Sequence, residues 1–465
     1  MSTSNVFESD IGSDWLRNSG IESILGQCQE KSPKLFHHDQ LGFFSIGLPP
    51  DSFRPSPENR RMIFWFPYGI PTSQSVAMVS SRLGKKLDQQ NQLFDAIRTH
   101  FCRFDRDDRF IVSHDSTATF PALRRAAELF HVPFVEFRRF PAKIDLDWFL
   151  GQLSDSNAAN TVFYEQLDKL EQKASIDKFL IESSCEIRVL GVRRSGNIHK
   201  AVLGRLDNDC ASRIFVLRNG ATVATLQRDL IERGAIGWYL YSKLENEVQC
   251  LPSKPFSQKS YETIDAFKRR SKLSDYLAHW TRRCNGPWPN QTNDEFQDEL
   301  IFHSKGSEHD RVNTLIKILA DQTLIAGNNV TRDHHRVVCF TEVPLDEFCQ
   351  RRTFRSHLNR WDFETVGIAI KKQVLQNLGA RRVIYGDESC WQNLDKNLRP
   401  YFQKSDGKID WSFEKEWRIT DNLDLGKINA SDAFVFVDDQ ENARKAAAFT
   451  NLPIIVLTAS QNSES

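Results

Sequence analysis

The sequence predicts an α/β region built on a parallel sheet, followed by a separate α+β domain. Two observations lead to this fold class. Between residues 59 and 260, apolar strand-like runs alternate with amphipathic helical segments, which is typical of parallel βαβ units in a Rossmann-like sheet. From residue 270 to 465, short strand-like runs follow one another with few helices between them, which favours an α+β domain. A length of 465 residues is enough for roughly two to four domains.

Composition limits the function classes that remain. The 61 basic residues balance the 61 acidic ones, so no global field draws the chain toward nucleic acid or anionic lipid. Hydrophobic residues make up 40% of the chain and charged residues 26%, which is typical of a folded globular protein. We therefore expect a folded protein that neither coats nucleic acid nonspecifically nor binds a membrane.

The nine cysteines are scattered along the chain and include no CxxC pair. This distribution favours reduced thiols over a disulfide framework or a zinc site. Residues 1–20 lack a basic segment followed by an apolar core, and no apolar stretch approaches the length of a membrane-spanning helix. We expect a cytoplasmic protein with no bound metal.

Residues 1–58 end in a polar, proline-rich stretch and are expected to form an N-terminal extension and linker. The α/β region at 59–260 could divide into lobes at 59–175 and 176–260. Apolar runs predict its strands, and apolar residues at helical spacing predict its helices. In chain order we expect strands within 62–70 and 76–81, a helix at 93–101, a strand at 109–114, a helix at 120–130 and a strand at 132–137.

Residues 112–137 can be aligned without a gap on residues 216–241, and both read as strand, polar loop, helix and strand. An internal duplication and convergent βαβ patterning both explain this match. Each loop follows the carboxyl end of a parallel strand, where open α/β sheets bind ligands at helix N-termini. Helix capping explains the same hydroxyl-bearing residues. The candidate nucleotide-sensing residues are Asp115, Ser116 and Thr117 in the first loop and Gly220 and Thr222 in the second.

Two further segments of this region bear on ligand binding. The stretch VAMVSSRLG at 76–84 resembles the first strand and following turn of the nucleotide-sensing, SLOG-like Rossmann domains of bacterial defence proteins. The basic turn that begins the stretch at 192–209 could contact a phosphate, and a solvated hairpin explains it equally well. The resemblance implies a nucleotide ligand for the α/β region.

The polar stretch at 255–275 is expected to connect the α/β region to the C-terminal domain at 270–465. Apolar residues at helical spacing predict a helix at 311–325 and another at 440–449. Runs rich in β-branched and aromatic residues predict the strands. These strands are expected at 336–343, 365–372, 381–386, 414–420, 433–437 and 452–458.

Three short segments of the C-terminal domain could carry chemistry, at 279–282, 339–344 and 411–418. If the third is a strand, its two-residue period places Glu414, Glu416 and Arg418 on one face. Two carboxylates beside an arginine suit the stabilisation of a cationic transition state. An exposed strand with an ion pair between Glu416 and Arg418 explains the same pattern.

In their order along the chain, the three segments resemble the ADP-ribosyltransferase fold. That fold has an arginine or histidine on a first strand, a hydroxyl-bearing motif on a middle strand and a glutamate, often as E-x-E, on a later one. More narrowly, CFTE at 339–342, GIAI at 367–370, VIY at 383–385 and WSFEKEWR at 411–418 resemble motifs of the bacterial abortive-phage-resistance AbiGi-like family. The resemblance covers about 40% of the chain and implies an antiphage defence role.

The resemblance also implies roles for individual residues. Glu416 would stabilise the oxocarbenium-like ribose as nicotinamide leaves NAD, and Glu414 would orient or deprotonate the acceptor. Thr341 would support the glutamate or the nicotinamide ribose. A carboxylate aimed at developing positive charge is a sound form of electrostatic catalysis. These residues are therefore the catalytic candidates, together with Arg282.

Basic residues are expected to bind NAD as a substrate, since the guanidinium group of an arginine suits a diphosphate. His279, Arg282 and Arg418 are the candidates that the resemblance implies. The chain departs from the family pattern in two places. The segment GPWPNQ at 286–291 belongs to an insert that the minimal fold lacks, and the middle motif is F-T-E where arginine-specific enzymes have S-T-S.

We therefore expect a bacterial defence-type protein that couples a nucleotide-binding or nucleotide-sensing α/β region to an NAD-dependent ADP-ribosyltransferase-like effector. NAD glycohydrolysis is a variant of the same reaction. The acceptor of ADP-ribose would be a protein or a nucleic acid. The alternative is a non-catalytic protein whose transferase-like domain only binds a nucleotide or a partner.

Overall fold

The structure is a computed structural model, and the chain divides into two compact units, which are described separately. Unit 1 comprises Met1–Glu247 and Thr292–Ser307, and unit 2 comprises Val248–Gln291 and Glu308–Ser465. The residues that the structure describes are 43–46, 62–66, 74–81, 83–84, 86–139, 160–164, 174–208, 213–218, 222–240, 260–303, 308–328, 331–355, 360–405 and 411–457.

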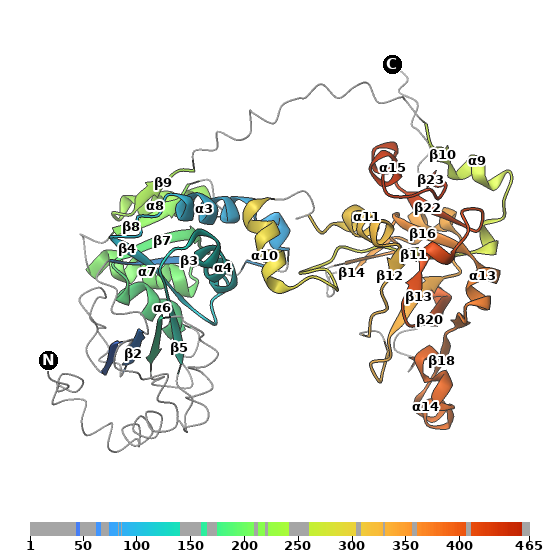
Figure 1. The fold of residues 1–465 in the computed structure, drawn as a ribbon, viewed down its shortest axis with the longest axis horizontal. Helices are drawn as coiled ribbons and strands as arrows, with labels where there is room; N and C mark the ends of the chain where they lie inside the picture. Colours follow the sequence, from blue (N-terminus) through green and yellow to red (C-terminus); the bar gives the residue numbers. More distant parts are fainter. Residues whose placement is uncertain are drawn as a thin grey trace. The chain divides into compact units, whose positions relative to one another are not determined.

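Unit 1 is built on one sheet, whose strands are joined largely by helices (Figure 1). The strands are β1 (Phe43–Ile46), β2 (Met62–Phe66), β3 (Gln74–Ser80), β4 (Arg109–His114), β5 (Phe134–Arg139), β6 (Asn160–Tyr164), β7 (Glu186–Gly191), β8 (Arg213–Leu217) and β9 (Ile236–Trp238). The helices are α3 (Asn91–Cys102), α4 (Phe120–Phe130), α6 (Ala174–Ser183), α7 (Asn197–Asn208), α8 (Ala224–Glu232) and α10 (Asn293–Phe302).

The strand order in this sheet is β1-β2-β6-β5-β4-β3-β7-β8-β9. From β6 to β9 neighbouring strands are parallel, whereas β1 and β2 are antiparallel additions at one edge. The chain moves outward from β3 through β4, β5 and β6, then returns to place β7 on the other side of β3. The expectation of a parallel α/β region is therefore confirmed.

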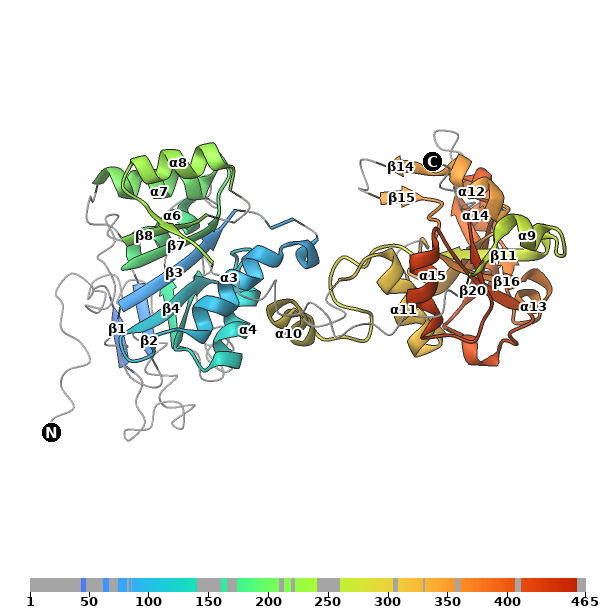
Figure 2. The ribbon, with the colours of Figure 1, turned by 90° about the horizontal axis from the view of Figure 1, so that it is seen from above.

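Both faces of the sheet are covered, which is why its central strands read as continuous apolar runs. One face packs against α6, α7 and α8, and the other against α3 and α4, on which α10 packs in turn (Figure 2). In β3, for example, Ala77 and Val79 point to the first core, whereas Val76 and Met78 point to the second. This layering makes unit 1 a doubly wound sheet.

Three sequence expectations differ from the structure of unit 1. Strand β1 lies within residues 1–58, which were expected to be an extension, but it pairs with β2 in the sheet. The segments 59–175 and 176–260 do not form separate lobes, because β3 and β7 pair directly. Helix α10 belongs to unit 1 although its residues lie inside the range expected for the C-terminal domain.

Helix α10 packs on α3 and α4 through Phe296, Leu300 and Ile301, which are all buried. An ion pair also joins α10 to α4, because Arg125 of α4 donates to both carboxylate oxygens of Asp298 at 2.6 and 2.8 Å. The helix starts with a capping box in which Thr292 and Glu295 satisfy each other's backbone amides. The insert around GPWPNQ therefore leads into a helix that completes unit 1.

Unit 2 contains a mixed eight-stranded sheet with helices on both faces. The strands of this sheet are β10 (Glu262–Thr263), β11 (Tyr276–Trp280), β13 (Val337–Thr341), β16 (Gly367–Lys371), β17 (Arg381–Arg382), β20 (Glu416–Thr420), β22 (Ala433–Val437) and β23 (Ile454–Val456), in the order β10-β23-β22-β16-β11-β13-β20-β17. The helices are α9 (Ile264–Lys268), α11 (Arg311–Asp321), α12 (Phe348–Arg351), α13 (Lys372–Asn377), α14 (Glu388–Asn393) and α15 (Gln440–Ala447).

Three short strand pairs lie outside this sheet. They are β12 (Thr323–Leu324) with β21 (Leu423–Asp424), β14 (Thr353–Arg355) with β15 (Arg360–Asp362), and β18 (Ile384–Gly386) with β19 (Phe402–Lys404). Strands with occasional helices and a mixed sheet agree with the α+β expectation for this part of the chain.

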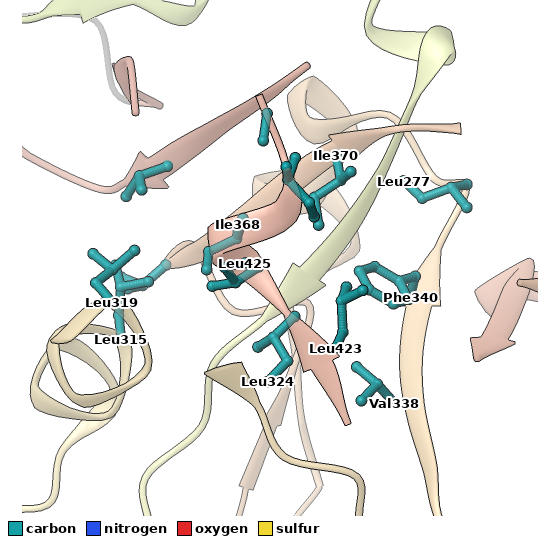
Figure 3. Close-up of a cluster of buried hydrophobic side chains, with 14 of the residues drawn as sticks. Leu277, Leu315, Leu319, Leu324, Val338, Phe340, Ile368, Ile370, Leu423 and Leu425 are labelled. Atoms are coloured by element: carbon teal, nitrogen blue, oxygen red, sulfur yellow. The ribbon is translucent and has the colours of Figure 1, made fainter. Parts of the chain in front are cut away.

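The two faces of the eight-stranded sheet have separate apolar cores. The first core joins the sheet to α11, α13 and α15, and Figure 3 shows part of it, with Leu315 and Leu319 of α11 beside Ile368. The second core joins the opposite face to α9 and α12 through an aromatic set that includes Phe267 and Phe348. In the described part of the chain, no helix is long and apolar enough to cross a membrane.

Candidate functional site

A pocket of about 580 Å³ opens at the carboxyl ends of β3 and β7. It is lined by Ser80 and Ser81 at the end of β3, by residues 89–93 at the start of α3 and by residues 190–193 at the end of β7. These two strands are the point where the chain reverses its direction across the sheet. Open α/β sheets bind ligands in the crevice at this crossover, because the loops after the two strands diverge there.

The pocket walls are fixed by hydrogen bonds between the segments that line it. The pairing of β3 with β7 shifts its register between Val79 and Ser80, and the Ser81 N–H then donates to the Gly191 carbonyl at 2.8 Å. The Ser81 hydroxyl accepts from the Arg193 N–H at 3.1 Å. The irregular ladder therefore joins the two strand ends across the floor of the pocket.

The lining is polar and favours an anion. Helix α3 begins at Asn91, and its N-cap residue, Gln90, makes no side-chain cap hydrogen bond in the described structure. The first turn of a helix presents unsatisfied N–H groups and a partial positive charge, which attract anions. Arg193 adds a full positive charge on the opposite wall. The amide side chains of residues 89–92 add hydrogen-bond donors and acceptors.

None of the candidate nucleotide-sensing residues that the structure describes is in the lining of this pocket. Thr222 is buried, and its hydroxyl accepts from the Val192 N–H at 2.9 Å, so it supports one wall. Asp115, Ser116 and Thr117 lie after β4, the neighbour of β3, and engage His114. Gly220 lies outside the described residues. The lining of the pocket therefore comes from segments other than the two predicted loops.

Sequence reasoning found part of this lining. The segment 76–84 and the basic turn after residue 192 both contribute to the pocket. The run of Gln89, Gln90, Asn91 and Gln92 was missed. Four amide side chains at the start of the helix that follows β3 would have been the signal, because that helix start faces the crossover.

In unit 2, Thr341 and Glu416 are opposite each other on neighbouring strands β13 and β20. Val338, Phe340, Trp417 and Ile419 point into the core beneath α11. Because side chains alternate along a strand, Thr341, Glu416 and Arg418 share the other face. The Thr341 hydroxyl donates to the Glu414 carbonyl at 2.5 Å and accepts from the Val343 N–H at 3.1 Å. It thus fixes the chain just before Glu416.

Glu414 is not on the strand that the sequence predicts for 414–420. It ends a short 3-10 turn, and Lys415 adopts a left-handed conformation with φ of 44° before β20 begins at Glu416. The expected alternation that would align Glu414 with Glu416 is therefore wrong. The two carboxylates instead flank a tight turn.

Glu416 is held by Arg418, which donates to both of its carboxylate oxygens at 3.0 and 3.1 Å. Arg418 is 1% exposed and also donates to the carbonyls of Pro400 and Phe402. These bonds engage its guanidinium within the fold. Arg418 is therefore placed to position Glu416, and its expected role in binding NAD directly does not fit this geometry.

His279 lies on the opposite face of the sheet from Thr341 and Glu416. Its ring contacts Phe340 in the core beneath α11, and its Nδ1 donates to the Cys339 carbonyl at 2.8 Å. Burial lowers the pKa of the imidazole. The sheet separates His279 from Glu416, so the structure does not bring these two candidates together.

Arg282 follows β11 and lies over the indole of Trp280, with 5.5 Å from the guanidinium carbon to the ring centroid. Its Nη2 is 3.6 Å from the buried carboxylate of Asp362. Trp280 contacts Phe363, and Phe363 contacts Phe413, the residue before Glu414. This ring series lies on the face that carries Thr341 and Glu416, so Arg282 approaches that face.

No protein-family model matches the chain, and neither does any curated protein. Among solved structures, the chain is similar to DNA processing protein A from Helicobacter pylori, described for its single-stranded DNA binding mode. The identity is 13% and the TM-score 0.27 over 42% of this chain and 90% of that one. DNA processing protein A from Streptococcus pneumoniae is similar at 12% identity and a TM-score of 0.26, over 38% of this chain and 62% of that one. Similarity at this level carries no inference about function.

Proposed function

We propose that unit 1 binds an anionic nucleotide in the pocket between β3 and β7. The observation that carries this proposal is the position of the pocket at the crossover of a doubly wound sheet. A phosphate group would sit at the start of α3, facing Arg193, where amide N–H groups and a guanidinium both favour negative charge. The amide side chains of residues 89–92 would bind the sugar or base through neutral hydrogen bonds.

Isothermal titration of the full-length protein with ATP, ADP, NAD and inorganic phosphate tests this proposal. We expect a nucleotide to bind, and we expect Arg193→Gln to weaken its binding about tenfold or more through loss of a charge-assisted contact. Arg194→Gln is the matched control, because Arg194 is exposed beside Arg193 and does not line the pocket. Equal binding by both variants, or no binding of any nucleotide by the wild type, would contradict the proposal.

A second proposal concerns unit 2, which we infer to act on NAD as an ADP-ribosyltransferase-like effector. It is supported by the common face of Thr341 and Glu416, which the motif resemblance assigns to the same reaction. Glu416 is 12% exposed at its side chain, so part of the side chain can be approached while Arg418 fixes the carboxylate. A fixed carboxylate would stabilise positive charge on the ribose as the bond to nicotinamide breaks.

In this proposal Arg282 binds the diphosphate, since it approaches the same face through Trp280. Glu414 orients the acceptor from the turn before β20, and its backbone carbonyl is held by Thr341. His279 has a structural role in this arrangement, because it is buried on the other face of the sheet. Hydrolysis of NAD without transfer would use the same groups with water as the acceptor.

Incubation of the protein with NAD, followed by measurement of free nicotinamide, tests the second proposal. Wild type should release nicotinamide, and Glu416→Gln should lose at least about a hundredfold in rate, a typical loss for a group that stabilises transition-state charge. Glu441→Gln is the control, because Glu441 is exposed on α15. If wild type and Glu416→Gln are equally inactive while nucleotide binding to unit 1 persists, the alternative of a non-catalytic binding protein holds.

The resemblance to abortive-phage-resistance proteins extends both proposals to bacterial defence. In that role, a nucleotide bound by unit 1 would control the activity of unit 2. Plaque counts on cells that produce wild type, Arg193→Gln or Glu416→Gln would test it. Protection by the wild type alone supports a sensor joined to an effector, and equal plaque counts for all three oppose a defence role.

A further inference from the structure

The β14–β15 hairpin of unit 2 presents a pair of exposed aromatic side chains. Phe354 is 46% exposed and Trp361 is 39% exposed, although large aromatic side chains are usually buried. They are direct partners across the two strands, with ring centroids 5.2 Å apart. Adjacent aromatic rings on the surface of a folded protein commonly mark a binding site.

One arginine guanidinium lies against these rings. The guanidinium of Arg352 lies over Trp361, at 4.5 Å from the ring centroid, and its Nη2 donates to Glu364 at 3.1 Å. On the same hairpin, the Nε of Arg355 donates to Asp362 at 2.9 Å. Both arginine side chains are about one-third exposed, at 30% and 34%. The guanidinium of Arg352 therefore borders the aromatic surface, whereas the register places Arg355 and Asp362 on the other face of the hairpin.

The carboxylates that hold these arginines are buried, since Asp362 is 1% exposed and Glu364 is 7% exposed. Each of them has a second arginine nearby. Arg311 donates to Glu364 at 2.7 Å, and Arg282 lies 3.6 Å from Asp362. The buried acids thus fix guanidinium groups at defined positions, so little side-chain entropy is lost when these groups meet a ligand.

We propose that the β14–β15 hairpin binds single-stranded nucleic acid. Unpaired bases would stack on Phe354 and Trp361, because every base offers a flat π-surface to an aromatic ring. A phosphate would contact the outward N–H groups of Arg352, which lies on the face of the rings. Rings bordered by a partly exposed guanidinium group suit this ligand better than an apolar protein surface, which offers no acceptor for its outward N–H groups.

A duplex is a poorer ligand for the hairpin, since its bases are already stacked on one another and paired. The neutral net charge of the whole chain does not oppose the proposal, because the contact is local and salt screens distant charges. The proposal is also independent of nucleotide binding in unit 1 and of NAD turnover in unit 2. The proposal adds a macromolecular ligand, single-stranded nucleic acid, to the nucleotide proposed for unit 1 and the NAD proposed for unit 2.

Fluorescence anisotropy with the full-length protein and labelled oligothymidine of about 12 nucleotides, within the known range of binding-site sizes, tests the proposal. We expect binding at about 50 mM salt that weakens steeply toward about 200 mM. The double variant Phe354→Ala/Trp361→Ala should bind at least about tenfold more weakly, because each lost stacking contact costs about that factor or more. Phe449→Ala is the matched control, since Phe449 is 44% exposed elsewhere in unit 2.

A second pair of variants tests the phosphate contacts. Arg352→Gln should lower the slope of log affinity against log salt by about 0.7, the value for one phosphate contact on a single strand. Glu364 keeps Arg311 in this variant, so the fold should persist, and a thermal melt checks this. Lys427→Gln is the control, because Lys427 is 76% exposed and lies outside the hairpin.

Three outcomes would overturn the proposal. The first is no binding of oligothymidine or oligouridine by the wild type at low salt. The second is equal affinity in wild type and the aromatic double variant. The third is concentration-dependent self-association in sedimentation that the double variant abolishes while oligonucleotide affinity stays unchanged, which would assign the rings to a contact between copies of the chain. Arg193→Gln should leave oligonucleotide binding intact, so failure of the unit 1 proposal is distinguishable.

Discussion

The carboxylate of Glu416 and the guanidinium of Arg418 form a two-bond ion pair between residues two apart on the same strand. Successive side chains alternate along β20, so both groups point to one face of the sheet. Arg418 is fully enclosed, whereas the Glu416 side chain is 12% exposed. The pair therefore fixes the orientation of a partly exposed glutamate side chain.

Arg418→Met should destabilise unit 2 by about 3–5 kcal/mol, because it leaves Glu416 and the carbonyls of Pro400 and Phe402 without their donor. Urea unfolding followed by tryptophan fluorescence measures this loss. Arg382→Met is the control, since Arg382 is 68% exposed and its ion pair with Glu342 should contribute less than about 1 kcal/mol. Similar losses in the two variants would contradict the prediction.

Gly367→Ala should destabilise unit 2, because an added Cβ would lie 2.1 Å from the His279 carbonyl oxygen on the paired strand β11. Relief would require movement of the central ladder, and we expect a cost of about 1–3 kcal/mol or more. Gly204→Ala should have the opposite sign. Gly204 lies within α7 with open space around it, so alanine should stabilise unit 1 by about 0.5–1 kcal/mol. Thermal unfolding of both variants checks this, and we expect a lower melting temperature for Gly367→Ala and a higher one for Gly204→Ala than for wild type.

Asp177 on α6 should make unit 1 less stable as pH rises. Burial raises the pKa of its carboxyl from 3.8 to about 6, and the nearby His114 opposes this effect. The folded state therefore prefers the protonated form, and stability is lost as pH rises from about 4 to about 6. Asp177→Asn should stabilise unit 1 by about 1–2 kcal/mol at pH 8, allowing for partial solvent exposure, and have little effect near pH 4. Urea unfolding of wild type and Asp177→Asn at both pH values measures this change in the free energy of unfolding. An equal change at pH 4 and pH 8 would contradict the prediction.

Removal of the apolar contacts of α10 should weaken unit 1. Phe296 is 3% exposed in the core with α3 and α4, so Phe296→Ala should cost about 3–5 kcal/mol. Phe302→Ala, on the same helix at 50% exposure, should cost less than about 1 kcal/mol. Hydrogen exchange of the α3 and α4 amides measures the effect, and we expect faster exchange in Phe296→Ala than in Phe302→Ala. Unchanged protection in Phe296→Ala would mean that α10 does not stabilise this face.

Cys339 should resist alkylation in the native protein. Burial beside the Glu416 carboxylate raises the pKa of its thiol, so the reactive thiolate is scarce at neutral pH. Cys102 is exposed at the end of α3 and serves as the comparison. Iodoacetamide labelling followed by peptide mass spectrometry should modify Cys102 first and Cys339 only after denaturation. Native labelling of Cys339 at a similar rate would overturn this assignment.

Local patterns predicted several elements with their bounds. The strands at 109–114 and 433–437 and the helix at 120–130 agree with β4, β22 and α4. These segments are buried along their length or on one clear face, so the local pattern reflects the final environment. Helix α4 also ends at a left-handed residue, His131, after a proline in its first turn.

Other boundaries depended on contacts that are distant in sequence. The helix expected at 311–325 ends at Asp321, because Gln322 adopts a left-handed conformation and Thr323–Leu324 pair with β21 nearly one hundred residues later. The strand expected at 414–420 starts two residues late because of the left-handed Lys415. A single sequence contains no signal for such pairings.

The candidate sites, too, could be predicted only in part, because their geometry depends on contacts that are distant in sequence. The neighbouring positions of Thr341 and Glu416 agree with what the motifs imply, whereas the burial of His279 on the other face follows from the pairing of β11 with β16. The unit 1 pocket joins the ends of β3 and β7, which are more than one hundred residues apart. Its lining therefore becomes visible only once the strand order is known.

The membership of α10 in unit 1 has a consequence for how the chain folds during synthesis. The sheet of unit 1 is complete in sequence at β9, yet the core around α3 and α4 still lacks Phe296, Leu300 and Ile301 of α10. The ribosome adds these residues only after it has made β11, the first long strand of unit 2. Unit 1 can therefore be completed only after part of unit 2 has been synthesised, and no single cut in the chain separates the two units intact.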